Sequence, residues 1–143
     1  MVTLGTGLVG GLVATIVMTV FMLVLGDDAS PPTARFWSKY VGDGNPADYM
    51  LQGMVLHLLY GVIAGGIFAV AVPLVGVVSL TSVGMAVFWG LAYGVALFIG
   101  AAVFWMKLVL GMEPGPKMVG LFLFFHLVYG AVLGGWLGIG VLG

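Results

Sequence analysis

The chain contains four long apolar runs that carry almost no charge, and this pattern restricts it to folds that a lipid bilayer can solvate. Of its 143 residues, 62% are hydrophobic and 6% are charged, whereas soluble domains carry roughly 25% charged residues. Each run has about the 20 residues that a helix needs to cross the apolar core of a bilayer. We therefore predict one all-α integral membrane domain over residues 1–143, a four-helix bundle with spans near 5–26, 50–75, 79–106 and 117–141.

The only sizeable polar segment lies between the first two runs, from Asp27 to Tyr49. Its proline pair at residues 31–32 is a helix-start signal. The aromatic and apolar side chains that follow share one helical face: Phe36, Trp37, Tyr40 and Val41. Amphipathic helices with aromatic side chains on one face lie at the headgroup level of a bilayer. We therefore predict a short interfacial helix over residues 31–42.

The basic residues indicate an orientation. They all fall in the two connections that share one side of the membrane: Arg35, Lys39, Lys107 and Lys117. Because cytoplasmic loops carry an excess of Lys and Arg, these two loops are predicted to be cytoplasmic and both termini outside, in a prokaryotic cell membrane. With so few basic residues and a net charge of -1, the chain lacks the clustered cations that nucleic-acid binding requires. The expected partner is the lipid bilayer.

A ten-residue stretch occurs twice and contains both histidines of the chain. Residues 57–66 read HLLYGVIAGG and residues 126–135 read HLVYGAVLGG. Both copies lie in spans that enter from the same side, so the two helices should run parallel with their histidines at similar depth. Helical spacing puts the histidine, the tyrosine at i+3 and the glycine at i+4 on one face. We therefore predict two parallel helical-hairpin repeats that turn these faces inward.

Three interpretations of the histidine pair stay open, because a histidine within a span is costly unless it is paired or bound. In the first, each imidazole makes a hydrogen bond across the bundle. In the second, His57 and His126 ligate one b-type haem, with space for the macrocycle at Gly61 and Gly130. Tyr60 and Tyr129 would then stand beside the haem. In the third, the histidines line a proton or solute path in a small channel or transporter.

Small residues four apart favour close packing between membrane helices. The candidate packing glycines are Gly7, Gly11, Gly65, Gly90, Gly94 and Gly134. In the first span, Thr15 and Thr19 are expected to donate hydrogen bonds to the preceding helical turn. A four-helix core could absorb the glycines of the first and third spans, but they have no evident partner in a bundle already closed by the other two spans. This predicts association with a second copy or with other membrane subunits.

The sequence offers little material for catalysis. It has no cysteine, no carboxylate within a span and no serine next to a histidine, so no catalytic residue is assigned. Met18 and Met22 are one helical turn apart, but a soft-metal site usually needs a third ligand, and none is evident from the sequence. No metal is therefore predicted apart from the haem iron.

With its first helix rich in glycine and threonine, its proline-started surface segment and two His-x-x-Tyr-Gly stretches, the chain resembles a loosely defined group of small four-helix prokaryotic membrane proteins of unassigned function. The resemblance implies the four-span fold and supplies no activity. The leading hypothesis is a non-catalytic accessory subunit that packs with itself or with a larger membrane complex, such as a respiratory or redox complex. The alternative is a haem-binding electron-transfer subunit.

Overall fold

The computed structural model describes the whole chain except residues 1, 28–29, 77–79, 81 and 141–143. All of the regular structure in the described residues is helical, as predicted. Its elements, in order, are α1 (Leu4–Leu25), α2 (Pro32–Tyr40), the 3-10 helix η1 (Pro46–Tyr49), α3 (Met50–Leu74), α4 (Val83–Ile99), the π-helix η2 (Gly100–Val109) and α5 (Pro116–Ile139).

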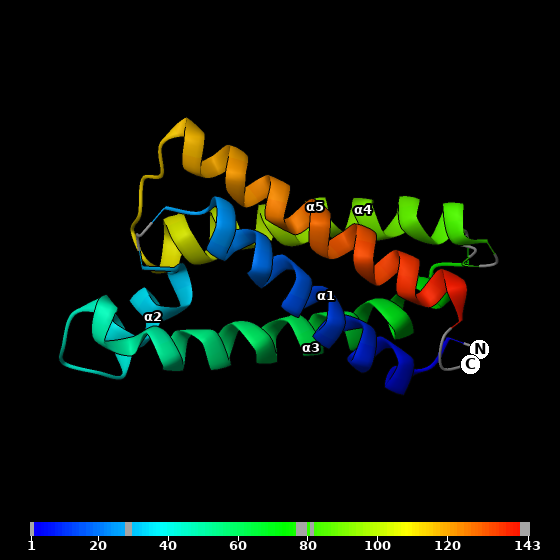
Figure 1. Ribbon diagram of the computed structural model, residues 1–143, viewed down its shortest axis with the longest axis horizontal. Helices are drawn as coiled ribbons and strands as arrows, with labels where there is room; N and C mark the ends of the chain where they lie inside the picture. The colour runs from blue at the N-terminus through cyan, green and yellow to red at the C-terminus, as the bar shows by residue number, and fades with distance from the viewer. Residues whose placement is uncertain (1, 28–29, 77–79, 81, 141–143) are drawn as a thin grey trace.

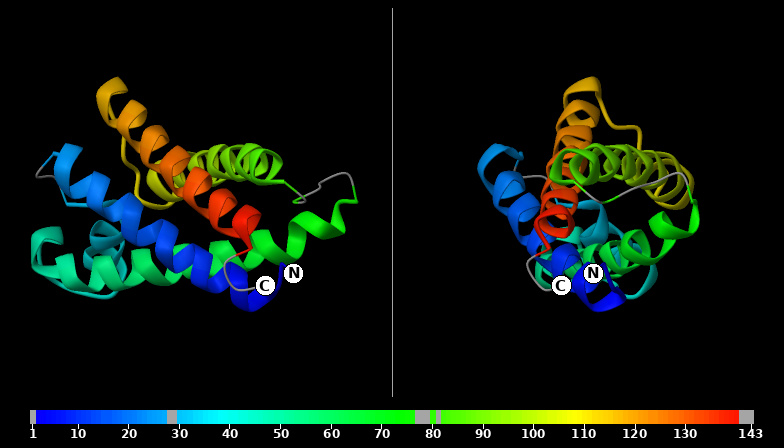
Figure 2. Two further views of the ribbon diagram at one scale, coloured as in Figure 1. Left: turned by 45° about the vertical axis from the view of Figure 1, so that its right-hand side comes forward. Right: turned by 90° about the vertical axis from the view of Figure 1, so that its right-hand side faces the viewer.

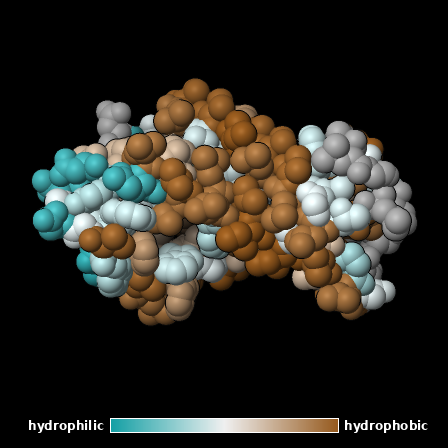
Figure 3. Space-filling model, turned by 90° about the horizontal axis from the view of Figure 1, so that it is seen from below, coloured by the Kyte–Doolittle hydropathy of each residue, from teal (hydrophilic) through white to brown (hydrophobic). Residues whose placement is uncertain are grey.

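Among the described residues, four helical segments are long and apolar enough to cross a membrane: Leu4–Leu25, Pro46–Leu74, Val83–Val109 and Pro116–Ile139. Large apolar side chains point outward from them; Leu23, Leu51 and Leu108 are 75%, 74% and 69% exposed. Figure 3 shows an apolar belt on one face, with hydrophilic residues gathered at the end that includes α2. The predicted all-α class is confirmed, and the four long apolar helices are consistent with the predicted four-span bundle. The expected span limits near residues 79 and 141 lie outside the described residues.

Hydroxyl side chains cap the starts of two helices, and a glycine ends a third. The Thr3 hydroxyl accepts a hydrogen bond from the Thr6 amide at 3.2 Å, and the Ser82 hydroxyl accepts one from the Met85 amide at 3.3 Å. Such side chains satisfy amides that have no partner in the first turn of a helix. At the other end of the chain, α5 stops at Gly140, whose φ of 63° is a conformation that glycine adopts without strain.

The spans pack in the order α3, α1, α5, α4. The antiparallel helices α1 and α3 form one close pair, α4 and α5 form another, and α1 joins the two pairs through α5 (Figures 1 and 2). Helix α3 makes no comparably close approach to α4 or α5 in the described part of the chain. One side of the bundle, between α3 and the α4–η2 segment, is therefore looser than the others.

Glycines form the close contacts within each pair. A Cβ added at Gly65 would lie 2.5 Å from the Gly11 Cα, and one added at Gly134 would lie 2.8 Å from the Val87 Cα. Gly90 packs in the same way against the backbone of α5 at Gly134. The expectation that glycines of the first and third spans would lack partners is therefore wrong. They meet the glycines of the second and fourth spans, as is common for small residues in membrane helices.

Helix α2 is attached to one end of the bundle. Ala34 is fully buried, and a Cβ at Gly53 of α3 would lie 2.8 Å from the Ala34 Cα. The Lys39 ammonium and the Tyr40 hydroxyl donate hydrogen bonds of 2.9 and 2.7 Å to the carbonyl oxygen of Val109, at the end of η2. Helix α2 therefore bridges α3 and η2 across the looser side of the bundle.

Candidate functional site

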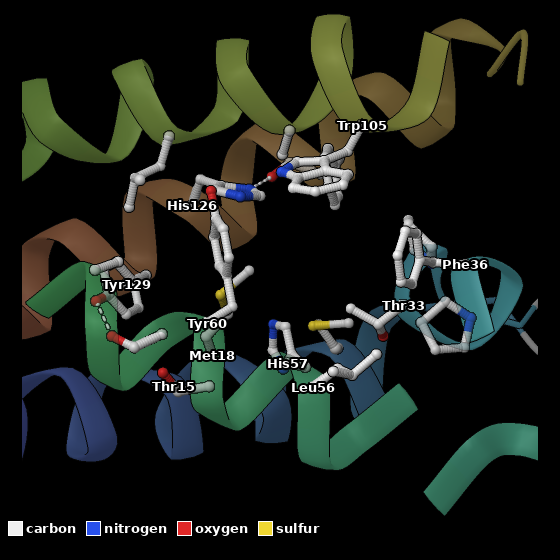
Figure 4. A pocket seen from close by; sticks show the side chains of 18 of the residues that line it. Thr15, Met18, Thr33, Phe36, Leu56, His57, Tyr60, Trp105, His126 and Tyr129 are labelled. Carbon is white, nitrogen blue, oxygen red and sulfur yellow. Dashed lines mark hydrogen bonds between the residues drawn. The ribbon is translucent and has the colours of Figure 1, made fainter. Parts of the chain in front are cut away.

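A cavity of about 210 Å³ lies among the spans, in the half of the bundle nearest α2 (Figure 4). All four spans contribute to its wall, and the start of α2 closes one end. There Phe36 of α2 meets Trp105 of η2 edge to face, with ring centroids 5.8 Å apart. The cavity exists because α3 is held away from α4 and α5 while α2 covers the space between them.

His57 of α3 lies on the wall of this cavity next to α1. Its Nδ1 atom is 3.5 Å from the Thr19 hydroxyl oxygen, and that hydroxyl donates its only hydrogen to the Thr15 carbonyl at 2.7 Å. Thr19 can therefore only accept from His57, which places a proton on Nδ1. The Thr15 hydroxyl donates to the Gly11 carbonyl at 2.6 Å, so the predicted threonine bonds to the preceding turn are confirmed.

His126 of α5 lies on the opposite wall and is 5% exposed. Its Nδ1 atom is 2.7 Å from the carbonyl oxygen of Phe122, one turn earlier in the helix. Because a carbonyl oxygen only accepts, Nδ1 must carry the proton in this bond. The Phe122 ring packs against the imidazole with centroids 4.6 Å apart, which fixes the orientation of the ring.

The structure thus brings both histidines to one cavity with the same tautomer. A neutral imidazole that donates through Nδ1 has a lone pair at Nε2. This is also the arrangement that orients metal-bound histidines, whose second nitrogen usually donates to a carbonyl or another acceptor. His57 and His126 therefore offer two basic nitrogens to a ligand in the cavity.

The two matching tyrosines lie in unequal surroundings. Tyr129 is 2% exposed and donates a 2.6 Å hydrogen bond from α5 to the Gly61 carbonyl of α3. Tyr60 is 40% exposed and extends from α3 across the cavity toward His126 (Figure 4). Tyr129 thus joins the two helix pairs, whereas Tyr60 is available to a ligand.

The two glycines considered for haem clearance serve helix packing. A Cβ at Gly61 would collide with the Thr15 hydroxyl of α1, and one at Gly130 would collide with the Gly90 carbonyl of α4. Gly61 lines the cavity, and Gly130 does not line it. The other candidate packing positions, Gly7, Gly11, Gly65, Gly90, Gly94 and Gly134, all lie at helix contacts within the two pairs.

Several cavity residues were not anticipated from the sequence. They are Met18, Met22, Phe36, Trp105 and Phe122. The helical spacing of Met18 and Met22 was a usable signal, but Phe36 and Trp105 meet only because α2 bridges to η2. A π-helix such as η2 has a wide turn that is frequent at functional sites, and its start at Gly100 has no clear sequence signature.

The cavity is apolar and uncharged. Among the described residues that line it there is no Asp, Glu, Lys or Arg, and the described part of the chain contains no group of three His, Cys, Asp or Glu side chains suited to a metal ion. The ionisable groups among the described lining residues are two imidazoles and two tyrosine hydroxyls, with no carboxylate and no cysteine beside them. The site offers nitrogen lone pairs to a ligand in apolar surroundings.

Comparisons with protein-family models, with curated proteins and with solved structures find no match to this chain.

Proposed function

We propose that this chain is a non-catalytic integral membrane subunit that holds a ligand within the bilayer, in the cavity between its helices. The observation that supports this proposal is the state of the two imidazoles. Nδ1 of His57 is directed to Thr19 and Nδ1 of His126 to Phe122, so both Nε2 lone pairs are available at one cavity. A polar nitrogen within an apolar site is costly unless a partner or a ligand binds it.

The proposed setting is the prokaryotic cell membrane, with the α2 end on the cytoplasmic side. All four basic residues of the chain belong to connections at that end or to helix ends beside it: Arg35, Lys39, Lys107 and Lys117. The positive-inside rule supports this orientation. Helix α2 would then lie at the headgroup level, and the ligand would sit closer to the cytoplasmic face than to the outer one.

The relation between the two helix pairs supports duplication of one hairpin. Gly61 and Gly130 hold matching places in the sequence repeat, and each faces the first helix of its own pair. The proposed assembly state is association with a larger membrane complex or with a second copy. The looser side between α3 and α4 supports this proposal. The glycines of α1 and α4 do not support it, because they pack against α3 and α5 of the same chain.

A b-type haem is the second candidate ligand, because two imidazole Nε2 atoms are its usual protein donors. The donor set fits, but the space does not. The cavity of about 210 Å³ is below the roughly 300–1,000 Å³ of pockets for larger ligands. Tyr60 also extends between the two walls. We therefore favour a smaller ligand.

The test is to purify the full chain from its own membranes and identify what remains bound. Visible spectroscopy would detect haem, elemental analysis a metal, and mass spectrometry of the intact complex an organic molecule. We expect about one ligand per chain, lost in His57→Leu and in His126→Leu. Gly120→Ala is the control, because a Cβ at Gly120 meets nothing within 4 Å. Equal ligand content in wild type and both histidine variants would contradict the proposal.

A further inference from the structure

We propose that the ligand is a soft monovalent metal ion, Cu(I), bound by the thioether sulfurs of Met18 and Met22 together with the Nε2 atoms of His57 and His126. The inference rests on the proposed function, because it uses the same two imidazole nitrogens. It adds the identity of the ligand and two further donors, both from α1.

The two methionines share one face of α1. Met18 and Met22 are four residues apart, which places their side chains next to each other on a helix. Both line the cavity. Met18 is 3% exposed and belongs to the buried core, and Met22 packs against that core. Met18 is therefore inside the bundle, and Met22 lies partly buried beside it at the cavity.

His57 lies at the same turn of α1. Thr19, the neighbour of Met18 in the sequence, is the residue whose hydroxyl lies 3.5 Å from the His57 Nδ1 atom. Figure 4 shows Met18 and His57 beside each other at the cavity, with His126 on the facing wall. The third ligand that the sequence did not reveal is thus supplied by α3, and a fourth by α5.

The chemistry of this donor set selects the ion. Thioethers are soft ligands that favour Cu(I), and imidazole binds copper well. All four donors are neutral, and the described lining has no carboxylate to balance a second charge. A divalent ion would therefore carry two uncompensated charges in an apolar site, which costs much more than one.

Buried methionines also serve as packing material, and the chain contains a comparison residue. Met106 of η2 is 1% exposed but does not line the cavity. Replacing Met by Leu nearly conserves volume and is among the best tolerated changes in a packed core. Met18→Leu, Met22→Leu and Met106→Leu are therefore matched changes, of which only the first two remove a proposed ligand.

The test is a Cu(I) titration of the purified full chain in detergent, under reducing and anaerobic conditions, against a competing colorimetric Cu(I) chelator. We expect one Cu(I) per chain, with affinity at least tenfold lower in Met18→Leu and in Met22→Leu. His57→Leu should lower it as much, and Met106→Leu should stay within twofold of wild type. X-ray absorption at the copper edge should show both sulfur and nitrogen donors.

Two results would overturn the inference. One is a wild-type chain that binds Cu(I) no better than the double variant Met18→Leu, Met22→Leu. The other is Cu(I) binding that is lost in the histidine variants and unchanged in both methionine variants. The second result would contradict the methionine ligands only, and the proposed binding of a ligand by the two imidazoles would still stand. That proposed function is contradicted by a different result, in which the purified protein retains its native ligand equally in wild type and in the histidine variants.

Discussion

The Tyr129 hydroxyl of α5 donates a 2.6 Å hydrogen bond to the Gly61 carbonyl of α3. It connects two helices whose backbones otherwise stay apart, and it does so one turn beyond both histidines. The equivalent tyrosine of the other sequence copy, Tyr60, instead lies at the cavity. The repeated segment thus provides a structural tyrosine in one place and a ligand-facing tyrosine in the other.

This difference predicts unequal costs for the same substitution. Tyr129→Phe should lower the free energy of unfolding by about 1 kcal/mol, because it removes a buried hydrogen bond that joins α5 to α3. Tyr60→Phe should cost less, since Tyr60 is 40% exposed against 2% for Tyr129. Unfolding in mixed detergent micelles, followed by circular dichroism, measures both. A larger loss for Tyr60→Phe would contradict the assignment.

The close approach of α4 and α5 predicts opposite effects for two alanine substitutions in one helix. Gly130→Ala should destabilise the protein by more than 1 kcal/mol, because its Cβ would collide with the backbone at Gly90. Gly120→Ala should be neutral or stabilising by up to about 1 kcal/mol, because its Cβ has open space. Melting temperatures in the same detergent compare the two. Similar melting temperatures for both variants would contradict the close approach of α4 and α5 at Gly130.

The attachment of α2 can be tested at Gly53. Gly53→Val should displace α2 from α3, because even a Cβ there would lie 2.8 Å from the Ala34 Cα. We expect amide hydrogen exchange in residues 32–40 to accelerate at least tenfold, while exchange in the middle of α5 stays unchanged. Exchange followed by mass spectrometry resolves the two regions. Unchanged protection of α2 would show that it is held by other contacts.

The orientation predicts which side of the membrane each loop faces. Since the chain has no cysteine, single cysteines placed at exposed positions report topology without background. Ala47→Cys should react with an impermeant thiol reagent only after cells are opened, and Val75→Cys should react in intact cells. The reverse pattern would place the α2 end outside the cell.

Composition and local signals were enough to predict the helical class and the spans, because each depends on residues close in sequence. The hydroxyl bonds of Thr15 and Thr19 were predictable for the same reason. The helices against which the glycines pack could not be predicted in this way. Helical periodicity indicates which residues share a face, but the helix that covers this face depends on the packing order of the bundle.

The candidate site was only partly predictable. The repeat indicated His57 and His126, and the structure places both at one cavity. Met18 and Met22 lacked a third ligand in the sequence because the missing donors lie on α3 and α5. Trp105 was missed because its place depends on the contact between α2 and η2. Long-range contacts decide these positions, and one sequence carries little information about them.

The proposed function depends on the tautomer of the two imidazoles, which donate through Nδ1 and keep the Nε2 lone pair for a ligand. The most direct test is nitrogen NMR of the full chain in lipid bilayers at neutral pH, with ¹⁵N-labelled histidine and no ligand added. Since the chain has only two histidines, single His→Leu variants assign the signals. We expect a protonated Nδ1 and an unprotonated Nε2 for each ring. A protonated Nε2 on either ring would contradict the account.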